Sequence, residues 1–262
     1  MASPWDPAQY NRFTAEREQP FWDLASLLEP SPSPLVVDLG CGDGRLTAAL
    51  HRQLGAARTT GVDSSPSMLA KATTYAGDDV RFEPGDIGEW RQTEIDIVFS
   101  NAALHWVSDH SRVLQRWRDA LTSGGQLAVQ MPANADHPSH RISRDLAINW
   151  FGDTAPRDPV AENVLRPEQY AELLHTLGFE RQHVRLQVYG HELSSAAEVV
   201  EWVKGTSLTR FRAVLTDDQY DQFVNEYRRR LLAELGDASP YFYAFKRILL
   251  WGSLREGTAE RT

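Results

Sequence analysis

The sequence is short of cysteine, of basic charge and of long apolar runs. Its 262 residues include one cysteine, Cys41, so no disulfide can form within the chain and a reducing compartment is expected. The net charge of -9 excludes a surface-wide attraction to nucleic acid or to an anionic membrane. No apolar stretch approaches a membrane span, and the first ten residues lack the basic start and apolar run of a secretory signal. We therefore expect a cytoplasmic protein that acts on a small molecule.

The chain is organised around the stretch LVVDLGCGDGR, residues 35–45. An apolar run followed by three alternating glycines predicts a buried strand that turns into a helix. Glycines such as Gly40 and Gly42 let the backbone turn sharply and let a ligand lie against it. A dinucleotide site has the spacing G-x-G-x-x-G and holds a pyrophosphate. Here the spacing is G-x-G-x-G, and Asp38 before it would repel a pyrophosphate, so we expect that carboxylate to meet a cation or a hydroxyl. Cys41 is explained more simply as a small buried side chain than as a nucleophile.

Two further predicted strands are followed by acids. The first ends at Asp63, a position where a carboxylate in a doubly wound sheet accepts hydrogen bonds from both hydroxyls of a ribose. The next covers 80–83 and leads to Asp86, which could accept a hydrogen bond from the amino group of an adenine. Ile87 and Met68 would then pack on the ring. Asp86 also fits an ordinary turn beside a glycine.

Strands and helices alternate five times up to residue 131. The predicted fourth strand covers 95–100, a helix covers 110–121, Gly124 and Gly125 end that helix, and the fifth strand covers 126–131. Right-handed crossovers between such strands give a parallel sheet with helices on both faces. The fold class is therefore α/β, with a doubly wound, Rossmann-like sheet.

The pattern changes after residue 132. Helices are predicted over 142–151 and 167–178, a sixth strand over 181–189 and a seventh over 241–254. The segment between the last two strands is too long for a hairpin and contains two predicted capping boxes, Ser195 with Glu198 and Thr216 with Gln219. We expect an N-terminal helical cover over 1–30, a core formed by 31–190 and 240–256, and a helical lid over 191–239.

The segment after the fourth strand reads NAALHW. Small residues at Asn101 and Ala102 would let the chain pass close to a ligand, and His105 and Trp106 would then face a substrate. The alternative is that both rings pack between strand and helix.

Six motifs resemble the trans-aconitate 2-methyltransferase family, within the class I methyltransferases that use S-adenosylmethionine. They are WDPAQY with AER, VDLGCGDG, TGVDSSPSM, FSNAALHW, LAVQMP and GTSL, and they extend over nearly the whole chain. Asp43 stands where the family can carry proline. The resemblance implies a seven-stranded sheet with a lid before the last strand, and it places the motif glycines against the methionine part of the cofactor. The cofactor-binding residues are then expected to be Asp38, Gly40, Cys41, Gly42, Asp63, Ser64, Met68, Asp86, Ile87, Asn101 and Ala102.

The resemblance also implies methyl transfer to a carboxylate of trans-aconitate. A carboxylate is ionised at neutral pH, so no general base and no metal are expected, and His105 is a candidate for positioning only. Arginine binds carboxylates through two parallel hydrogen bonds, although a single arginine more often lies on a solvated surface. The expected substrate-binding residues are Tyr10, Arg17, His105, Trp106, Arg210, Tyr241 and Arg247. The alternative function is methylation of another small acid, an acyl thioester or a hydroxyl, and the expected oligomeric state is a monomer or a weak homodimer.

Overall fold

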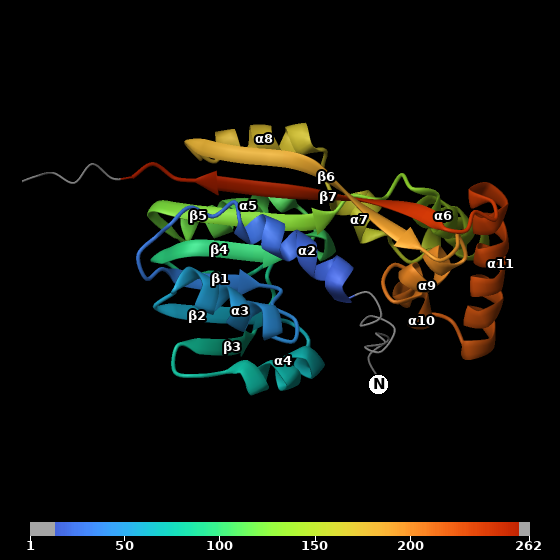
Figure 1. Cartoon of the computed structure of the whole chain (residues 1–262), viewed down its shortest axis with the longest axis horizontal. Coiled ribbons are helices and arrows are strands. Elements are labelled where there is room, and N and C mark those ends of the chain that lie inside the picture. Colours follow the sequence, from blue (N-terminus) through green and yellow to red (C-terminus); the bar gives the residue numbers. More distant parts are fainter. Residues whose placement is uncertain (1–13, 257–262) are drawn as a thin grey trace, which may run out of the picture. The chain divides into compact units, whose positions relative to one another are not determined.

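The computed structural model describes the backbone of residues 14–256 and the side chains from Glu18 onward (Figure 1). A seven-stranded sheet has the strand order β3-β2-β1-β4-β5-β7-β6. Its strands β1 to β5 pair in parallel, and β7 runs antiparallel to β5. The strands are β1 (Leu35–Leu39), β2 (Arg58–Asp63), β3 (Val80–Pro84), β4 (Ile95–Asn101), β5 (Leu121–Pro132), β6 (Arg181–Leu193) and β7 (Tyr241–Ser253). The predicted α/β doubly wound fold is confirmed.

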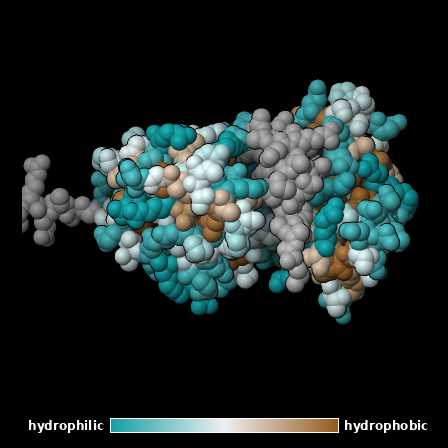
Figure 2. All heavy atoms as spheres, turned by 90° about the horizontal axis from the view of Figure 1, so that it is seen from below, coloured by the Kyte–Doolittle hydropathy of each residue, from teal (hydrophilic) through white to brown (hydrophobic). Residues whose placement is uncertain are grey.

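The helices follow the strands as the alternating pattern predicted. The α-helices are α2 (Thr14–Ala25), α3 (Arg45–Leu54), α4 (Pro66–Ala72), α5 (His110–Asp119), α6 (Pro138–Phe151), α7 (Pro159–Asn163), α8 (Pro167–Thr176), α9 (Glu198–Lys204), α10 (Thr209–Arg212) and α11 (Asp217–Leu235). Three 3-10 turns, η1 (Thr73–Tyr75), η2 (Leu104–Trp106) and η3 (Gly152–Thr154), complete the described set. None of the described helices is long and apolar enough to cross a membrane. Hydrophilic residues make up much of the face in Figure 2.

The chain divides into two compact units. Among the described residues, the sheet unit comprises 19–132, 163–187 and 247–256, and the helical unit comprises 14–18, 133–162 and 188–246. In the sheet unit, α2 and α3 pass in front of the strands in Figure 1 and bury Phe21, Leu24 and Leu50 against them. Parallel pairing of β1 with both β2 and β4 sets the register at their carboxyl ends.

The helical unit has an apolar core of its own. Leu146 of α6, Trp202 of α9, Phe211 of α10 and Phe223 of α11 are all buried in one cluster. The unit therefore contains 133–162 as well as the segment 191–239 that the sequence suggested as a lid, because α6 packs its apolar side on α11.

Two local predictions were wrong. β5 begins at Leu121 rather than at residue 126, and Gly124, with φ +76°, lies inside that strand beside a register irregularity between Ile95 and Ile97. Ser195 does not cap α9, because the helix begins at Glu198, whose carboxylate accepts from the Ser194 amide at 2.9 Å. The other predicted capping box, Thr216 with Gln219 at the start of α11, is confirmed.

Candidate functional site

The glycine turn after β1 is tied to the end of β2. The amides of Gly40 and Cys41 both donate to the Val62 carbonyl, at 2.8 and 3.1 Å. One oxygen of Asp63 accepts from the Gly42 amide at 2.9 Å, and the other accepts from the Ser65 amide at 2.8 Å. The half-buried carboxylate of Asp63 thus lies beside the turn and fixes its shape.

Two of the glycines have different reasons to be glycine. A Cβ on Gly40 would lie 2.1 Å from the Cβ of Ala103, so the turn could not pack against the segment after β4 with any side chain there. A Cβ on Gly42, at φ +57°, would meet nothing within 4 Å. Gly40 is therefore needed for packing, whereas Gly42 borders open space in which a ligand can lie against the backbone.

Asp38 lies buried beneath this turn. Its side chain is 2% exposed and accepts a hydrogen bond from the Thr47 hydroxyl at 2.5 Å, which joins β1 to the first turns of α3. Burial raises the pKa of Asp38 to about 7. Burial, together with the nearby carboxylates of Asp38 and Asp63, raises the pKa of the Cys41 thiol far above its ordinary value. Cys41 is thus a protonated, buried side chain, as expected of a residue that is not a nucleophile.

The acid after β3 lies close to the end of β2. Asp63 is the register partner of Pro84, and its carbonyl accepts from the Gly85 amide at 3.0 Å. Asp86 is exposed and turns the chain by accepting from the Gly88 amide at 2.8 Å. Ile87 next to it is buried.

The remaining two residues of this part of the prediction lie just after β2. Ser64 is exposed, and Met68 is half-buried in the first turn of α4, with its amide capped by Ser65. Asp63 ends β2, Ser64 and Met68 come shortly after it, and Asp86 follows the neighbouring strand β3. All four residues therefore lie at one edge of the sheet.

The segment after β4 returns to the same edge. Ala102 has φ +53°, and its amide donates to the Gln130 carbonyl at 2.8 Å. His105 is buried, while Trp106 is 61% exposed, so the alternative in which both rings pack inside is wrong for Trp106. The two rings lie 4.8 Å apart.

Two residues that the sequence did not single out hold this segment in place. His110 Nε2 lies 3.0 Å from the carbonyls of both Leu104 and Val107, and burial lowers its pKa. Asn163 donates to the His105 carbonyl at 2.9 Å. The one sequence feature that could have indicated His110 is its place at the start of an amphipathic helix, and no local feature of the sequence indicates Asn163.

The predicted substrate residues are divided between the two units. Tyr10 and the side chain of Arg17 lie outside the described part of the chain. His105 and Trp106 belong to the sheet unit, as does Arg247, which faces Pro132 where β7 pairs with the end of β5. Arg210 and the half-buried Tyr241 belong to the helical unit. Their roles toward a substrate remain predictions.

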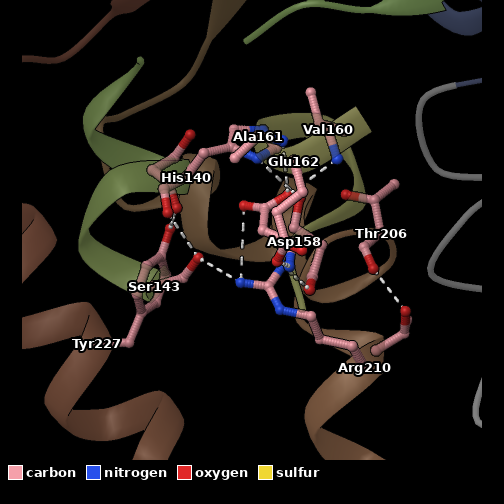
Figure 3. A network of polar contacts seen from close by, with 12 residues as sticks. His140, Ser143, Asp158, Val160, Ala161, Glu162, Thr206, Arg210 and Tyr227 are labelled. Atoms are coloured by element: carbon pink, nitrogen blue, oxygen red, sulfur yellow. Dashed lines mark hydrogen bonds and ion pairs between the residues drawn. The ribbon is translucent and has the colours of Figure 1, made fainter. Parts of the chain in front are cut away.

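Arg210 lies in the network of polar contacts drawn in Figure 3. Its side chain is 10% exposed; Nη2 lies 3.8 Å from Asp158 and donates to Ser143 at 3.2 Å, while Nη1 donates to the Ser207 carbonyl at 2.9 Å. Burial lowers the pKa of Arg210, and burial also lowers the pKa of the adjacent His140 to about 4. The charge of Arg210 is therefore balanced by Asp158 within the helical unit, which the sequence did not suggest.

The sheet edge presents groups that suit a nucleoside joined to an amino acid. A carboxylate beside a glycine turn, a second carboxylate on the neighbouring strand end, and a bare backbone facing open space are the features described above. In addition, the buried Oδ1 of Asn101 has no hydrogen-bond partner in the part of the chain that the structure describes. A ligand carrying hydroxyl and ammonium donors would satisfy these acceptors.

Comparisons with known proteins agree with a site for a nucleoside joined to an amino acid. Residues 36–125 match the model of a methyltransferase domain. Solved structures with the same fold include the YcgJ protein of a Bacillus species (TM-score 0.59, 17% identity, covering 92% of this chain and 100% of that one). Another is phosphoethanolamine N-methyltransferase 2 of Haemonchus contortus (TM-score 0.57, 18% identity, covering 91% and 53%). The fold and the site define a class I methyltransferase that uses S-adenosylmethionine.

Relatives over the full length narrow the class to a family. A trans-aconitate 2-methyltransferase of Deinococcus radiodurans is 41% identical, covering 94% of this chain and 96% of that protein. A second, from Streptomyces coelicolor, is 37% identical and covers 98% and 89%. The chain belongs to the trans-aconitate 2-methyltransferase family, which confirms the resemblance seen in its motifs.

Proposed function

We propose that this protein transfers the methyl group of S-adenosylmethionine to a carboxylate of trans-aconitate, giving a monomethyl ester and S-adenosylhomocysteine. The observation that carries the proposal is full-length identity of about 40% to relatives of that name. The glycine turn and the acid at the end of β2, both present in the structure, support it. Small-molecule chemistry also accords with the acidic net charge.

The residues of the sheet edge would hold the cofactor in distinct parts. Asp63 would accept from the ribose hydroxyls and Asp86 from the adenine amino group. Ile87 and Met68 would border the ring, and the backbone at Gly42 would lie along the methionine part. When bound, the cofactor supplies a methyl group on a positively charged sulfur.

Methyl transfer to a carboxylate requires little acid or base catalysis from the protein. A carboxylate oxygen of the substrate forms the new bond to the methyl carbon while the carbon–sulfur bond breaks and its electron pair stays on sulfur. No proton moves, because the carboxylate is already ionised near neutral pH. The contribution of the protein is alignment of the three reacting atoms and removal of water from the attacking oxygen.

Two features of the sheet unit support this positioning role. His105 is buried, and its backbone carbonyl accepts from Asn163, which holds the segment after β4 in place. Arg247 lies at the end of β5, a position suited to binding a carboxylate that is not methylated. We expect the attacking carboxylate to be held by neutral donors, because a bidentate arginine would lower its nucleophilicity. The single buried cysteine supports a cytoplasmic location as a further part of the proposal.

The test is identification of both products. Purified protein is incubated with S-adenosylmethionine and trans-aconitate, and mass spectrometry then measures S-adenosylhomocysteine and the monomethyl ester. We expect the two to accumulate in equal amounts. Binding of S-adenosylhomocysteine without ester formation would retain the cofactor and overturn the substrate, and the other small acids and hydroxyl compounds would then be the candidates.

A further inference from the structure

Two glutamines of β5 lie on the same face of the sheet but in opposite situations. Alternate residues of a strand share a face, so Gln126 and Gln130 lie on the side of Ala128, which is buried in the core with α2 and α3. Both polar atoms of the Gln126 side chain have partners: its oxygen accepts from the Glu29 amide at 2.8 Å and from Trp251 Nε1 at 2.9 Å, and its nitrogen donates to the Glu29 carbonyl at 3.0 Å.

Gln130 has none of these contacts. Its residue is 0% exposed, yet neither Oε1 nor Nε2 has a hydrogen-bond partner in the described part of the chain. A buried carboxamide without partners destabilises a folded protein, and such groups are rare in native structures. Gln126 shows that this face of the strand can hold a glutamine for structural reasons, and Gln130 serves no such purpose.

The orphaned amide lies next to another unpartnered atom. Asn101 is the register partner of Gln130 on the adjacent strand β4, and its buried Oδ1 also has no partner among the described residues. Neighbouring strands are about 4.8 Å apart, so one small group can reach both side chains. Asn101 leads directly into Ala102 and Ala103, and Ala103 is the residue that touches the Gly40 turn.

We propose that Gln130, together with Asn101, binds the α-amino-carboxylate end of S-adenosylmethionine. This inference rests on the proposed function for its cofactor, and it adds a residue of β5 to the glycine turn and strand-end acids described above. In either orientation, the Gln130 amide offers one acceptor and one donor group, and Asn101 Oδ1 offers a second acceptor. An ammonium group can donate to both acceptors while the adjacent carboxylate accepts from the amide nitrogen.

A substrate carboxylate matches this set less well. It brings only acceptors, so it would satisfy the amide nitrogen and leave both oxygen acceptors without a partner. The arginine at this edge, Arg247, is the more suitable group for such a carboxylate. The zwitterionic end of an amino acid satisfies all three atoms.

The test compares two ligands and two glutamines. S-adenosylhomocysteine carries the amino-acid end, whereas 5′-methylthioadenosine carries the same adenosine and sulfur without it. Dissociation constants for both are measured by calorimetry on the wild type, on Gln130→Met and on the matched control Gln126→Met, and thermal unfolding of each unliganded protein is recorded.

We expect Gln130→Met to weaken the binding of S-adenosylhomocysteine by about 10- to 100-fold. The dissociation constant of 5′-methylthioadenosine should change by no more than about twofold. The unfolding midpoint of Gln130→Met should equal or exceed that of the wild type, because an unsatisfied buried amide has been removed. Gln126→Met should show the reverse, with a lower midpoint and unchanged affinities. Gln130→Glu, which keeps an acceptor and loses the donor, should also weaken only S-adenosylhomocysteine, and it serves if the methionine variant does not fold.

Three results would overturn the inference. Unchanged affinity for S-adenosylhomocysteine in Gln130→Met would make the amide irrelevant to the cofactor, and a raised KM for the acid alone would assign it to the substrate. Equal weakening of both ligands would indicate a general distortion. A wild-type protein that binds neither ligand would overturn the proposed function itself, which keeps the two failures distinguishable.

Discussion

Replacing Asp63 with alanine should change both folding stability and cofactor binding, by amounts that the structure allows to be separated. The carboxylate accepts from the Gly42 and Ser65 amides at 2.9 and 2.8 Å. A hydrogen bond to a charged group contributes about 1.5–3 kcal/mol, and the lower end applies to a half-buried carboxylate. The loss of two such bonds should therefore lower the free energy of unfolding by about 3 kcal/mol, or about 5 to 10 °C in the unfolding midpoint.

The same substitution removes the acceptor proposed for the ribose hydroxyls. Loss of two further hydrogen bonds to this carboxylate should raise the dissociation constant of S-adenosylhomocysteine, measured by calorimetry, by about 100-fold. Asp43→Ala is the matched control, because Asp43 is an exposed acid of the same turn and accepts a hydrogen bond from the Arg45 amide at 3.2 Å. We expect it to leave both quantities nearly unchanged. An Asp63→Ala protein with a lowered midpoint and unaltered affinity would show that the acid only shapes the turn, and the ribose assignment would be wrong.

Three further predictions concern Gly42, Asp38 and the pair of Arg210 with Asp158. Gly42→Ala should lower the free energy of unfolding by about 1 kcal/mol, because Gly42 has a positive φ. Its methyl group would occupy the open space proposed for the ligand, so the affinity for S-adenosylhomocysteine should fall. Unchanged affinity would show that the ligand lies elsewhere. The raised pKa of Asp38, about 7, means that the folded state holds a proton that the unfolded state loses near pH 4. Stability should therefore fall between about pH 4 and 7, by ~4 kcal/mol at most, and denaturant titrations of Asp38→Asn should lack this component. Arg210→Met should cost about 3–5 kcal/mol by leaving Asp158 buried and unpaired, and adding Asp158→Asn should restore part of the loss; additive losses would argue against the pair.

Features determined by neighbouring residues could be predicted from the sequence. The glycine turn, the strand ending at Asp63 and the Thr216 capping box depend on conformational preferences within a few residues, and the structure has them where they were expected. Alternation of strands and helices gave the sheet because crossovers have one hand. The bounds of β5 were wrong because Gly124 reads as a helix stop, whereas it adopts a positive φ inside a strand irregularity.

Features determined by distant residues could not be predicted. Arg210 looked like a free cation, and its partner Asp158 is 52 positions earlier in the chain. Asp38 follows an apolar run at the start of a turn, and nothing in that run shows that the Thr47 hydroxyl would cover it. The contrast between Gln126 and Gln130 arises entirely from which backbone groups and rings lie opposite each side chain in the folded sheet.

The most direct test of the central claim is transfer of label from methyl-labelled S-adenosylmethionine to a panel of acids. The panel contains trans-aconitate, cis-aconitate, isocitrate, citrate, malonate and a monocarboxylate, and kcat/KM is measured for each. We expect trans-aconitate to have the highest kcat/KM and its label to lie in a base-labile ester, and we expect the monocarboxylate to remain unlabelled. Equal labelling of the monocarboxylate, or no labelled acid despite binding of S-adenosylhomocysteine, would contradict the central claim.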